Sequence, residues 1–201
     1  MDLRELKEYR ILDRNFYCRD TAEVAKSLLG KLLVKFSGGN TIVAGFIVET
    51  EAYYGADDPA SHAFRGRTPR SSIMFGKPGI AYIYFCYGAH FMLNAVTEKD
   101  GTPGAVLIRS VATVKGTEAM MSGRKTGCIT YLANGPGKLT RIFGIDLSDN
   151  GKDMTAPASD LGIFESKEAL PSKRIYNSQR VGIKSGKDKQ LRFLIKDVCQ
   201  S

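Results

Sequence analysis

Two glutamates at the end of an apolar run are the first candidates for chemistry. The segment IVETEAYYG covers residues 47–55, and alternation along a strand would project Glu49, Glu51 and Tyr53 from one face. Carboxylates at positions i and i+2 lie about 6–7 Å apart, close enough to influence each other's protonation. Such a pair can serve acid–base catalysis, although carboxylates that follow an apolar strand are also common as plain strand-end charges.

A cationic partner for these carboxylates is available at Arg109. This arginine ends the apolar run AVLI, where an unpaired guanidinium would be costly to bury. Pairing with Arg109 would orient Glu51 and keep it ionised. The same two residues could also form a structural ion pair without catalysis, and their spacing leaves both interpretations open.

The segment that follows the glutamates contains no acidic residue. From Pro59 to Thr97 the chain is free of Asp and Glu but carries four basic residues and seven aromatic ones. Basic groups that neutralise phosphates, interleaved with rings that stack on bases, are typical of a nucleic-acid surface. Most of these rings could instead belong to the core. Tyr87 fits a core least well, because it is expected at the tip of a hairpin beside Gly88.

A second basic segment runs from residue 173 to residue 192. It holds seven Lys and Arg residues against the single Asp188, and it would be either a solvated loop or a flank that contacts phosphates. Over the whole chain, 29 Lys and Arg face 21 Asp and Glu, a formal net charge of +8. This excess favours an anionic partner only weakly, since many proteins are mildly basic.

Other classes of protein are disfavoured by composition. The four cysteines are widely spaced without a C-x-x-C pair, and two histidines add no zinc ligand set, so we expect no metal site and reduced thiols. The first sixteen residues are charged throughout, unlike a signal peptide. The apolar stretch 80–96 carries three tyrosines, a histidine and an asparagine, which argues against a membrane span.

The elements that must position these residues follow from periodicity and turn signals. Residues 20–29 read as a helix capped by Asp20, with Gly30 at its end. Pro136 is placed near a second helix start. Strands are expected at 31–36 and 41–54 around a Gly-rich link, in two halves of 80–96, at 104–110 and at 191–197, and a further helix at 117–125. We therefore predict one α+β domain over residues 1–201, with the first fifteen or so loosely ordered.

These residues also match a known family. The sequence resembles the alkyladenine (3-methyladenine) DNA glycosylases of the vertebrate-and-bacterial type, over about residues 16–196. The resemblance rests on LLGKLLV, ETEAY, a histidine nine residues after its tyrosine, TPR, MF, KPG, the Y-x-Y-x-x-Y-G hairpin, FMLN, AVLIR, GPGKL, RVGI and LRF. It implies a base-excision repair enzyme, built on a curved, mainly antiparallel sheet flanked by helices, with a β-hairpin that inserts into DNA.

The resemblance also implies roles for single residues. Glu51 matches the general base that activates water, and Arg109 the arginine that holds that water and the flipped nucleotide. Tyr87 matches the residue that fills the gap in the duplex. Asn94 matches the pocket residue that crowds the amino group of guanine. The residues matching the base pocket are Tyr53, His62, Tyr84, Asn94 and His90, and those expected to contact the DNA backbone are Arg65, Arg67, Arg70, Lys77, Lys138 and Arg180.

The implied reaction is hydrolysis by a monofunctional glycosylase without cofactor or metal. Its partner would be double-stranded DNA containing alkylated purines, with deaminated and etheno purines as further candidates, and the protein would act as a cytoplasmic monomer at the bacterial nucleoid. Two departures from the family pattern, His90 and Lys184, bear on base preference and not on the reaction.

Two other interpretations compete with this one. A non-catalytic nucleic-acid-binding module would bind DNA without releasing base, but would leave the pairing of Glu51 with Arg109 unexplained. A sugar hydrolase could use Glu49 and Glu51 as its two carboxylates. The acid-free basic segment would then have no purpose.

Overall fold

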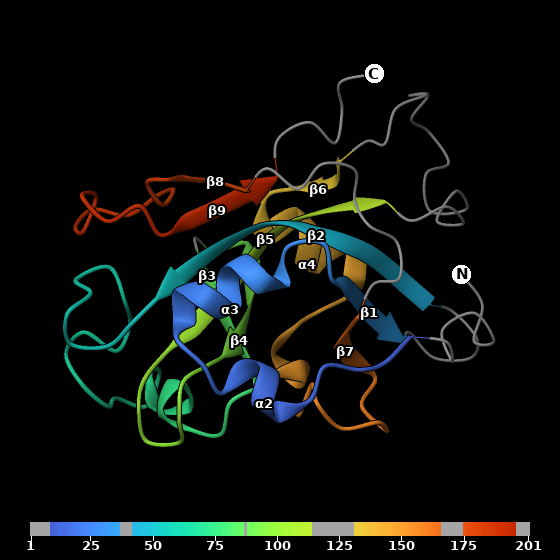
Figure 1. Ribbon diagram of the computed structural model, residues 1–201, viewed down its shortest axis with the longest axis horizontal. Helices are drawn as coiled ribbons and strands as arrows, with labels where there is room; N and C mark the ends of the chain where they lie inside the picture. Colours follow the sequence, from blue (N-terminus) through green and yellow to red (C-terminus); the bar gives the residue numbers. More distant parts are fainter. Residues whose placement is uncertain (1–8, 37–41, 87, 114–130, 166–174, 196–201) are drawn as a thin grey trace.

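The computed structural model describes residues 9–36, 42–86, 88–113, 131–165 and 175–195. Within them a curved sheet of antiparallel strands forms the centre of the molecule, in the order β3-β4-β5-β2-β1-β7, with β6 on β5 and β8 on β9 (Figure 1). The strands are β1 Leu32–Phe36, β2 Ile42–Tyr53, β3 Ala81–Cys86, β4 His90–Val96, β5 Ala105–Thr113, β6 Tyr131–Asn134, β7 Leu161–Phe164, β8 Ile175–Ser178 and β9 Arg192–Ile195. The helices are α2 Arg14–Tyr17, α3 Thr21–Leu28, α4 Pro136–Phe143 and the short 3₁₀ turns η1 Ser72–Phe75 and η3 Leu147–Asp149. The expected α+β class is confirmed.

The long strand β2 organises the sheet because it pairs with three others. Its first half lies between β1 and β5, and its second half lies between β9 and β5. Glu51 is thereby placed opposite Leu107 of β5 and Arg192 of β9. Register shifts on either side of Glu49 bend the strand at this point. The backbone that carries the two glutamates is therefore fixed from both edges.

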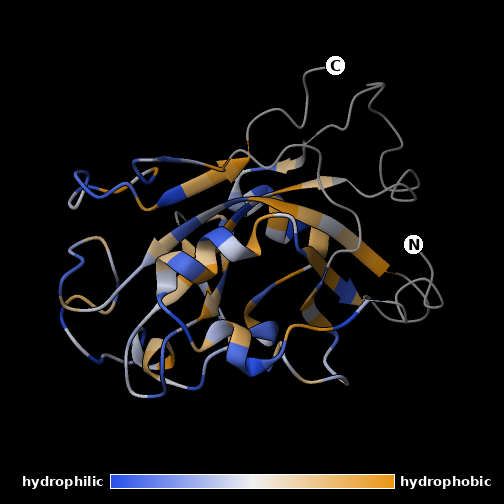
Figure 2. Cartoon of the chain, viewed as in Figure 1, coloured by the Kyte–Doolittle hydropathy of each residue, from blue (hydrophilic) through white to orange (hydrophobic). Residues whose placement is uncertain are grey.

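The helices cover the sheet as the sequence predicts. Asp20 caps α3 by accepting the backbone N–H groups of Ala22 and Glu23, both at 3.0 Å. The buried side of α3 packs on β2, and Gly30 follows at a φ of +82°. Pro136 is the first residue of α4, which packs against β4 and ends at Gly144 in the left-handed region. Figure 2 shows hydrophobic residues concentrated along the strands, whereas the loops are largely hydrophilic.

The apolar stretch 80–96 forms the predicted hairpin. Strands β3 and β4 pair so that Tyr84 faces Met92 and Tyr82 faces Asn94. Gly88 adopts a φ of +67° at the turn, a conformation that favours glycine. Tyr87, expected at the tip, lies outside the described residues. Side chains along β3 and β4 alternate between two faces. Ile83 and Leu93 are buried in the core, and the opposite face carries the tyrosines.

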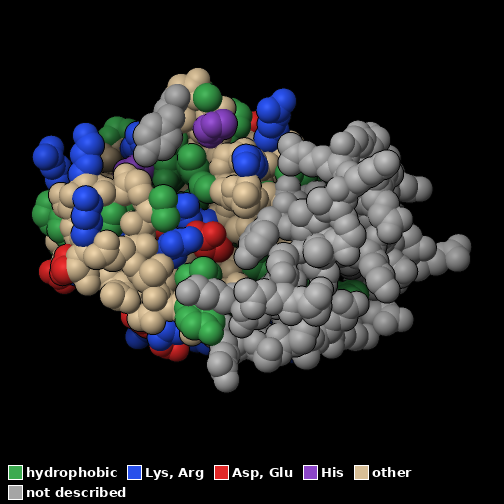
Figure 3. All heavy atoms as spheres, turned by 90° about the horizontal axis from the view of Figure 1, so that it is seen from above, with side chains coloured by type: hydrophobic (Ala, Val, Ile, Leu, Met, Phe, Trp, Pro, Cys, Tyr) green, Lys and Arg blue, Asp and Glu red, His purple; other side chains and the backbone are tan. Residues whose placement is uncertain are grey.

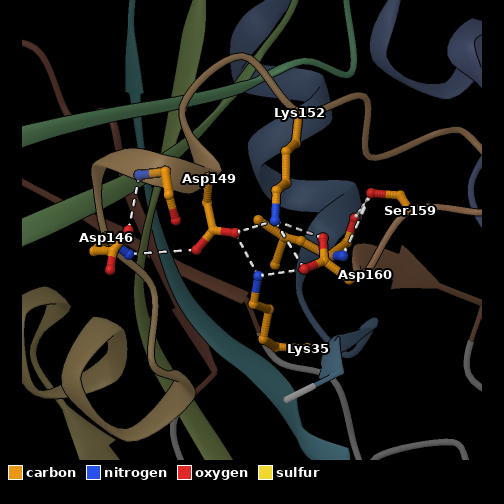
Figure 4. Close-up of polar contacts among 8 residues, drawn as sticks. Lys35, Asp146, Asp149, Lys152, Ser159 and Asp160 are labelled. Carbon is orange, nitrogen blue, oxygen red and sulfur yellow. Dashed lines mark hydrogen bonds and ion pairs between the residues drawn. The ribbon is translucent and has the colours of Figure 1, made fainter. Parts of the chain in front are cut away.

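An ion-pair network ties β1 to the segments around η3 and β7 (Figure 4). Lys35 contacts Asp149, and it lies 2.9 Å from Asp160. Lys152 reaches the same two carboxylates at 2.6 and 2.7 Å. The side chains of Lys35 and Asp149 are only 8% and 2% exposed, so each charge is matched where water is scarce.

Within the N-terminal segment expected to be loosely ordered, the structure describes residues 9–15, where Leu12 is buried and its N–H donates to Ile163 O at 2.8 Å. Residues 1–8, the link 37–40 and the helix expected at 117–125 lie outside the described residues. In the described part of the chain, no helix has the length and apolar character needed to cross a membrane.

Candidate active site

A cavity of about 690 Å³ opens where β2 to β5 meet two loops and the start of α4. It is lined from β2 by Tyr53, from β5 by Arg109 and from β3 and β4 by the hairpin residues. The loops at 59–62 and 181–185 and the junction of β6 with α4 at 134–138 close the rim. Seen from above, the described part of the molecule shows many Lys and Arg side chains in blue and few carboxylates in red (Figure 3). The cavity is large enough to admit one small ligand.

Glu51 is completely buried beside this cavity, with a 0% exposed side chain. Its Oε2 accepts a hydrogen bond from the Tyr53 hydroxyl at 2.8 Å, and its Oε1 accepts the backbone N–H of Val181 at 2.7 Å. Burial raises the pKa of Glu51 above its ordinary value, although Arg109, Val181 and Tyr53 each lower it. Pairing with Arg109 thus favours the ionised form, as expected, but does not fully offset the effect of burial on this pKa.

Arg109 links both glutamates of β2. Its Nε donates to Glu49 Oε1 at 2.7 Å, and its Nη1 lies 3.3 Å from Glu51 Oε2. Arg192 of β9 donates to the same Glu49 oxygen at 2.7 Å. The Glu49 carboxylate is thus bonded by two guanidinium groups, and this arrangement fixes the position of Arg109. This division of roles argues against Glu49 and Glu51 as the two carboxylates of a sugar hydrolase.

Aromatic side chains form one wall of the cavity. The His62 ring meets the Tyr84 ring edge to face, with centroids 4.6 Å apart, and His62 Nδ1 is 2.7 Å from the Tyr82 hydroxyl. His62 is exposed as a residue, but partial burial of its ring, together with the nearby Arg70 guanidinium, lowers its pKa to about 4. Burial raises the pKa values of Tyr53 and Tyr84. The wall is therefore made of uncharged rings near neutral pH, a surface suited to stacking.

Two further residues from the hairpin lie at the cavity. Asn94 is 3% exposed, and its Nδ2 donates to the carbonyl oxygens of Tyr82 and Met92 at 3.0 and 3.3 Å, which fixes the amide. His90 is exposed at the rim and packs on the first turn of α4, where a Cβ on Gly137 would lie 2.6 Å from His90 Cγ. Both line the cavity with Tyr53, His62 and Tyr84, so the structure brings together the five predicted pocket residues.

Comparison with known proteins gives this arrangement a family. The family model described as methylpurine-DNA glycosylase (MPG) matches residues 15–199. The chain belongs to the methylpurine-DNA glycosylase family. A "Putative 3-methyladenine DNA glycosylase" of Prosthecochloris aestuarii is 46% identical over 185 residues, which cover 92% of this chain and 87% of that protein. Proteins of the same name from Carboxydothermus hydrogenoformans (43% identical; 93% and 96% covered) and Koribacter versatilis (39%; 97% and 94%) are also similar.

Membership of the methylpurine-DNA glycosylase family makes the chain a DNA N-glycosylase, which is a hydrolase. DNA is the substrate of such an enzyme. The described residues include no group of three or more His, Cys, Asp or Glu that could hold a metal ion.

Most of the basic residues expected to contact DNA are on the surface of this methylpurine-DNA glycosylase. Arg65, Arg67, Arg70, Lys77 and Lys138 are exposed, and Lys138 lies at the rim of the cavity. Two of these side chains also lie over rings: Arg67 over Phe75 at 5.0 Å, and Arg70 over Tyr84 at 4.9 Å. Their contacts with the DNA backbone stay predictions, as does the role of Tyr87.

The expectation for Arg180 is wrong. Its side chain is 0% exposed and pairs with Asp58, which is also fully buried, so no phosphate can reach it. Arg192 likewise bonds Glu49, and Lys189 bonds the Asp57 carbonyl. The basic segment that contains these residues is therefore partly structural. Sequence reasoning also missed Val181, because a backbone N–H donor has no side-chain signature.

Proposed function

We propose that this glycosylase flips alkylated purines out of duplex DNA and hydrolyses their N-glycosidic bond, leaving an abasic site. The observation that carries the proposal is the buried carboxylate of Glu51, held by Arg109 and Val181, which both line the aromatic cavity. The names of the relatives favour 3-methyladenine as a substrate. Hypoxanthine and ethenoadenine are further candidates that need separate tests.

The cavity wall suits a cationic base. Uncharged, electron-rich rings attract cations through their faces by about 0.5–2 kcal/mol each. Tyr53 and Tyr84 are uncharged near neutral pH, since their ordinary pKa of 10.0 is raised further by burial, and the pKa of His62 is lowered to about 4. An alkylated purine such as N3-methyladenine carries positive charge while it is attached to the sugar, so these rings would bind it better than an undamaged purine.

Glu51 would supply the base for hydrolysis. A water molecule attacks the anomeric carbon, and its proton passes to the Glu51 carboxylate while the N-glycosidic electron pair leaves with the purine. The negative charge of Glu51 also stabilises the positive charge that develops on the sugar. A pKa raised by burial brings a carboxylate closer to the range in which a general base is effective. Because water is the nucleophile, the strand is not cut and the enzyme is monofunctional.

The hairpin β3–β4 would open the duplex. Extruding a base costs a few kcal/mol of stacking and pairing, and a wedge in the vacated space offsets part of that cost. In the sequence, Tyr87 follows β3 and precedes β4, the two strands that supply Tyr84 and Asn94 to the cavity. A single hairpin would thus couple insertion into DNA to formation of the pocket. We expect the protein to act as a cytoplasmic monomer.

The decisive experiment is an incubation with methylated duplex DNA, followed by chromatography of the released bases. The wild-type protein should release 3-methyladenine and leave sites that break only on alkali treatment. Glu51→Gln should bind lesion DNA but release no base. Full activity of Glu51→Gln would rule out the proposed mechanism, and binding without any release by the wild-type protein would favour a non-catalytic nucleic-acid-binding module.

A further inference from the structure

The buried guanidinium of Arg180 connects three segments beside the glutamate. Its Nη1 and Nη2 each bond one oxygen of Asp58 at 2.6 Å, and Nη1 also donates to Ala52 O at 2.9 Å. Asp58 in turn accepts the backbone N–H of Tyr54 at 3.0 Å. Burial alone would raise the pKa of Asp58, but the bonds from Arg180 hold it below its ordinary value. The pair is therefore ionised, and it joins the end of β2 to two loops.

The residues next to this pair are those that contact Glu51. Val181, which follows Arg180, donates its N–H to Glu51 Oε1 at 2.7 Å. Ala52, whose carbonyl accepts from Arg180, follows Glu51 in β2. The guanidinium carbon of Arg180 also lies 4.6 Å from the centre of the Tyr53 ring, and Tyr53 donates its hydroxyl to Glu51. Movement of Arg180 would thus displace two of the hydrogen-bond donors of Glu51.

The loop between β8 and β9, residues 179–191, packs closely against the pair. Gly186 in this loop has a φ of +67°, and a Cβ at this position would lie 3.2 Å from Arg180 Nη2 and 3.6 Å from Asp58 Oδ1. Lys189 bonds the carbonyl of Asp57, next to Asp58. The loop is consequently held to the segment 57–58 on both sides of Gly186, which leaves Val181 little freedom of its own.

We infer that Asp58 and Arg180 form a positioning pair that holds the Val181 N–H on Glu51 and keeps this carboxylate aimed at the reacting sugar. The inference rests on the proposed role of Glu51 as the general base. A hydrogen bond from Val181 to the carboxylate favours its ionised form. Loosening the pair should therefore raise the pKa of Glu51, whereas a pair that only stabilised the fold would leave this pKa unchanged.

The other charged and titratable groups around Glu51 are kept constant by choosing variants that conserve charge. These groups come from β2, β3, β5, β9 and the loop: Glu49, Tyr53, Tyr84, Arg109, Arg192 and Arg180. Arg180→Lys and Asp58→Glu retain every charge but break the two-bond geometry. Asp160→Glu is the matched control, because it distorts an ion pair in the remote network of Figure 4.

The test measures single-turnover release of 3-methyladenine as a function of pH, with the full chain. In Arg180→Lys and Asp58→Glu, the acidic limb of the profile should move to higher pH by about one unit, the effect of losing one hydrogen bond to a charged group. The plateau rate should fall about tenfold or more, as expected when a catalytic group is misplaced. Asp160→Glu should lower the melting temperature without moving the limb.

A second measurement separates this inference from the proposed function. The carboxyl of Glu51 is titrated by NMR in glutamate-labelled wild-type and Arg180→Lys protein, which requires no activity. A higher pKa in the variant supports the positioning role even if the wild-type protein releases no methylpurine. Folded variants with wild-type profiles and an unchanged Glu51 pKa would overturn it. Loss of the fold in both charge-conserving variants would assign the pair a structural role and overturn it as well.

Discussion

The guanidinium of Arg109 approaches the carboxylate of Glu51 to 3.3 Å, yet the pKa of Glu51 stays above its ordinary value. Arg109 is shared, since its Nε bonds Glu49 at the shorter distance of 2.7 Å. Burial removes Glu51 from water completely and outweighs this partial neutralisation. An ionised Glu51 therefore lowers the stability of the folded protein, which is a common property of catalytic groups.

Because a buried, ionised Glu51 destabilises the folded state, we expect Glu51→Gln to stabilise the protein near neutral pH. A pKa raised in the folded state means that the native protein binds the proton more tightly than the unfolded chain. The resulting stability is complete below the ordinary value of 4.5 and is lost as pH rises through the folded pKa. Denaturant unfolding at pH 7 should show a gain within the range of about 0.5–2 kcal/mol that stabilising substitutions give. The gain should disappear below pH 4.

Asp160→Asn is the control with the opposite sign. Burial would raise the pKa of Asp160, but bonds from Lys152 and Lys35 hold it below its ordinary value. Its contribution to stability is therefore present above 3.8 and lost as pH falls. Asp160→Asn should destabilise the protein at pH 7, with a smaller loss in acid. A Glu51→Gln variant less stable than wild type at pH 7 would contradict the assigned balance of burial and pairing.

The second prediction concerns Tyr87 and the hairpin. Replacing a wedge by serine removes the group that fills the gap in the duplex, so flipping becomes less favourable. Tyr87→Ser should lower 3-methyladenine excision from fully paired duplexes more strongly than excision from mismatched or flexible DNA, in which less stacking must be broken. Single-turnover rates on matched and mismatched duplexes provide the comparison. An equal loss on both substrates would count against a wedge.

Much of the fold was predictable because its signals are local. The cap at Asp20, the turn at Gly88 and the strand that carries Glu51 each depend on residues within a few positions of one another. Alternation along β2 placed Glu51 and Tyr53 on one face, and their hydrogen bond at 2.8 Å agrees with it. The resemblance then supplied the pocket residues, which the cavity brings together.

The contacts that were missed join residues distant in sequence. Arg180 stands in a stretch rich in lysine and arginine, a pattern typical of a solvated face, but its partner Asp58 is 122 positions earlier. Val181 contacts Glu51 through its backbone N–H across 130 positions, and its apolar side chain gives no sign of this. Such pairs depend on how loops are brought to the sheet, which neither periodicity nor composition records.

The third prediction tests the ion-pair network of Figure 4. Asp149→Asn removes the carboxylate that Lys35 and Lys152 both contact, where the Asp149 side chain is 2% exposed. Taking one partner from a buried pair costs about 3–5 kcal/mol, and the low end applies here because Asp160 still contacts both lysines. Denaturant unfolding at pH 7 should show this loss. A change within experimental error would mean that water already screens the network.

The last prediction concerns discrimination against normal guanine. The amide of Asn94 is fixed by its bonds to the Tyr82 and Met92 carbonyl oxygens, so a group pressed against it meets a rigid wall. Asn94→Ser removes bulk at this position and should raise guanine release from undamaged DNA about tenfold or more, the usual effect of one small group in a binding pocket. Release of 3-methyladenine should change much less. Asn94→Gln, which adds bulk, is the matched control and should not raise guanine release. An unchanged ratio of guanine to 3-methyladenine release in Asn94→Ser would remove the residue from base selection.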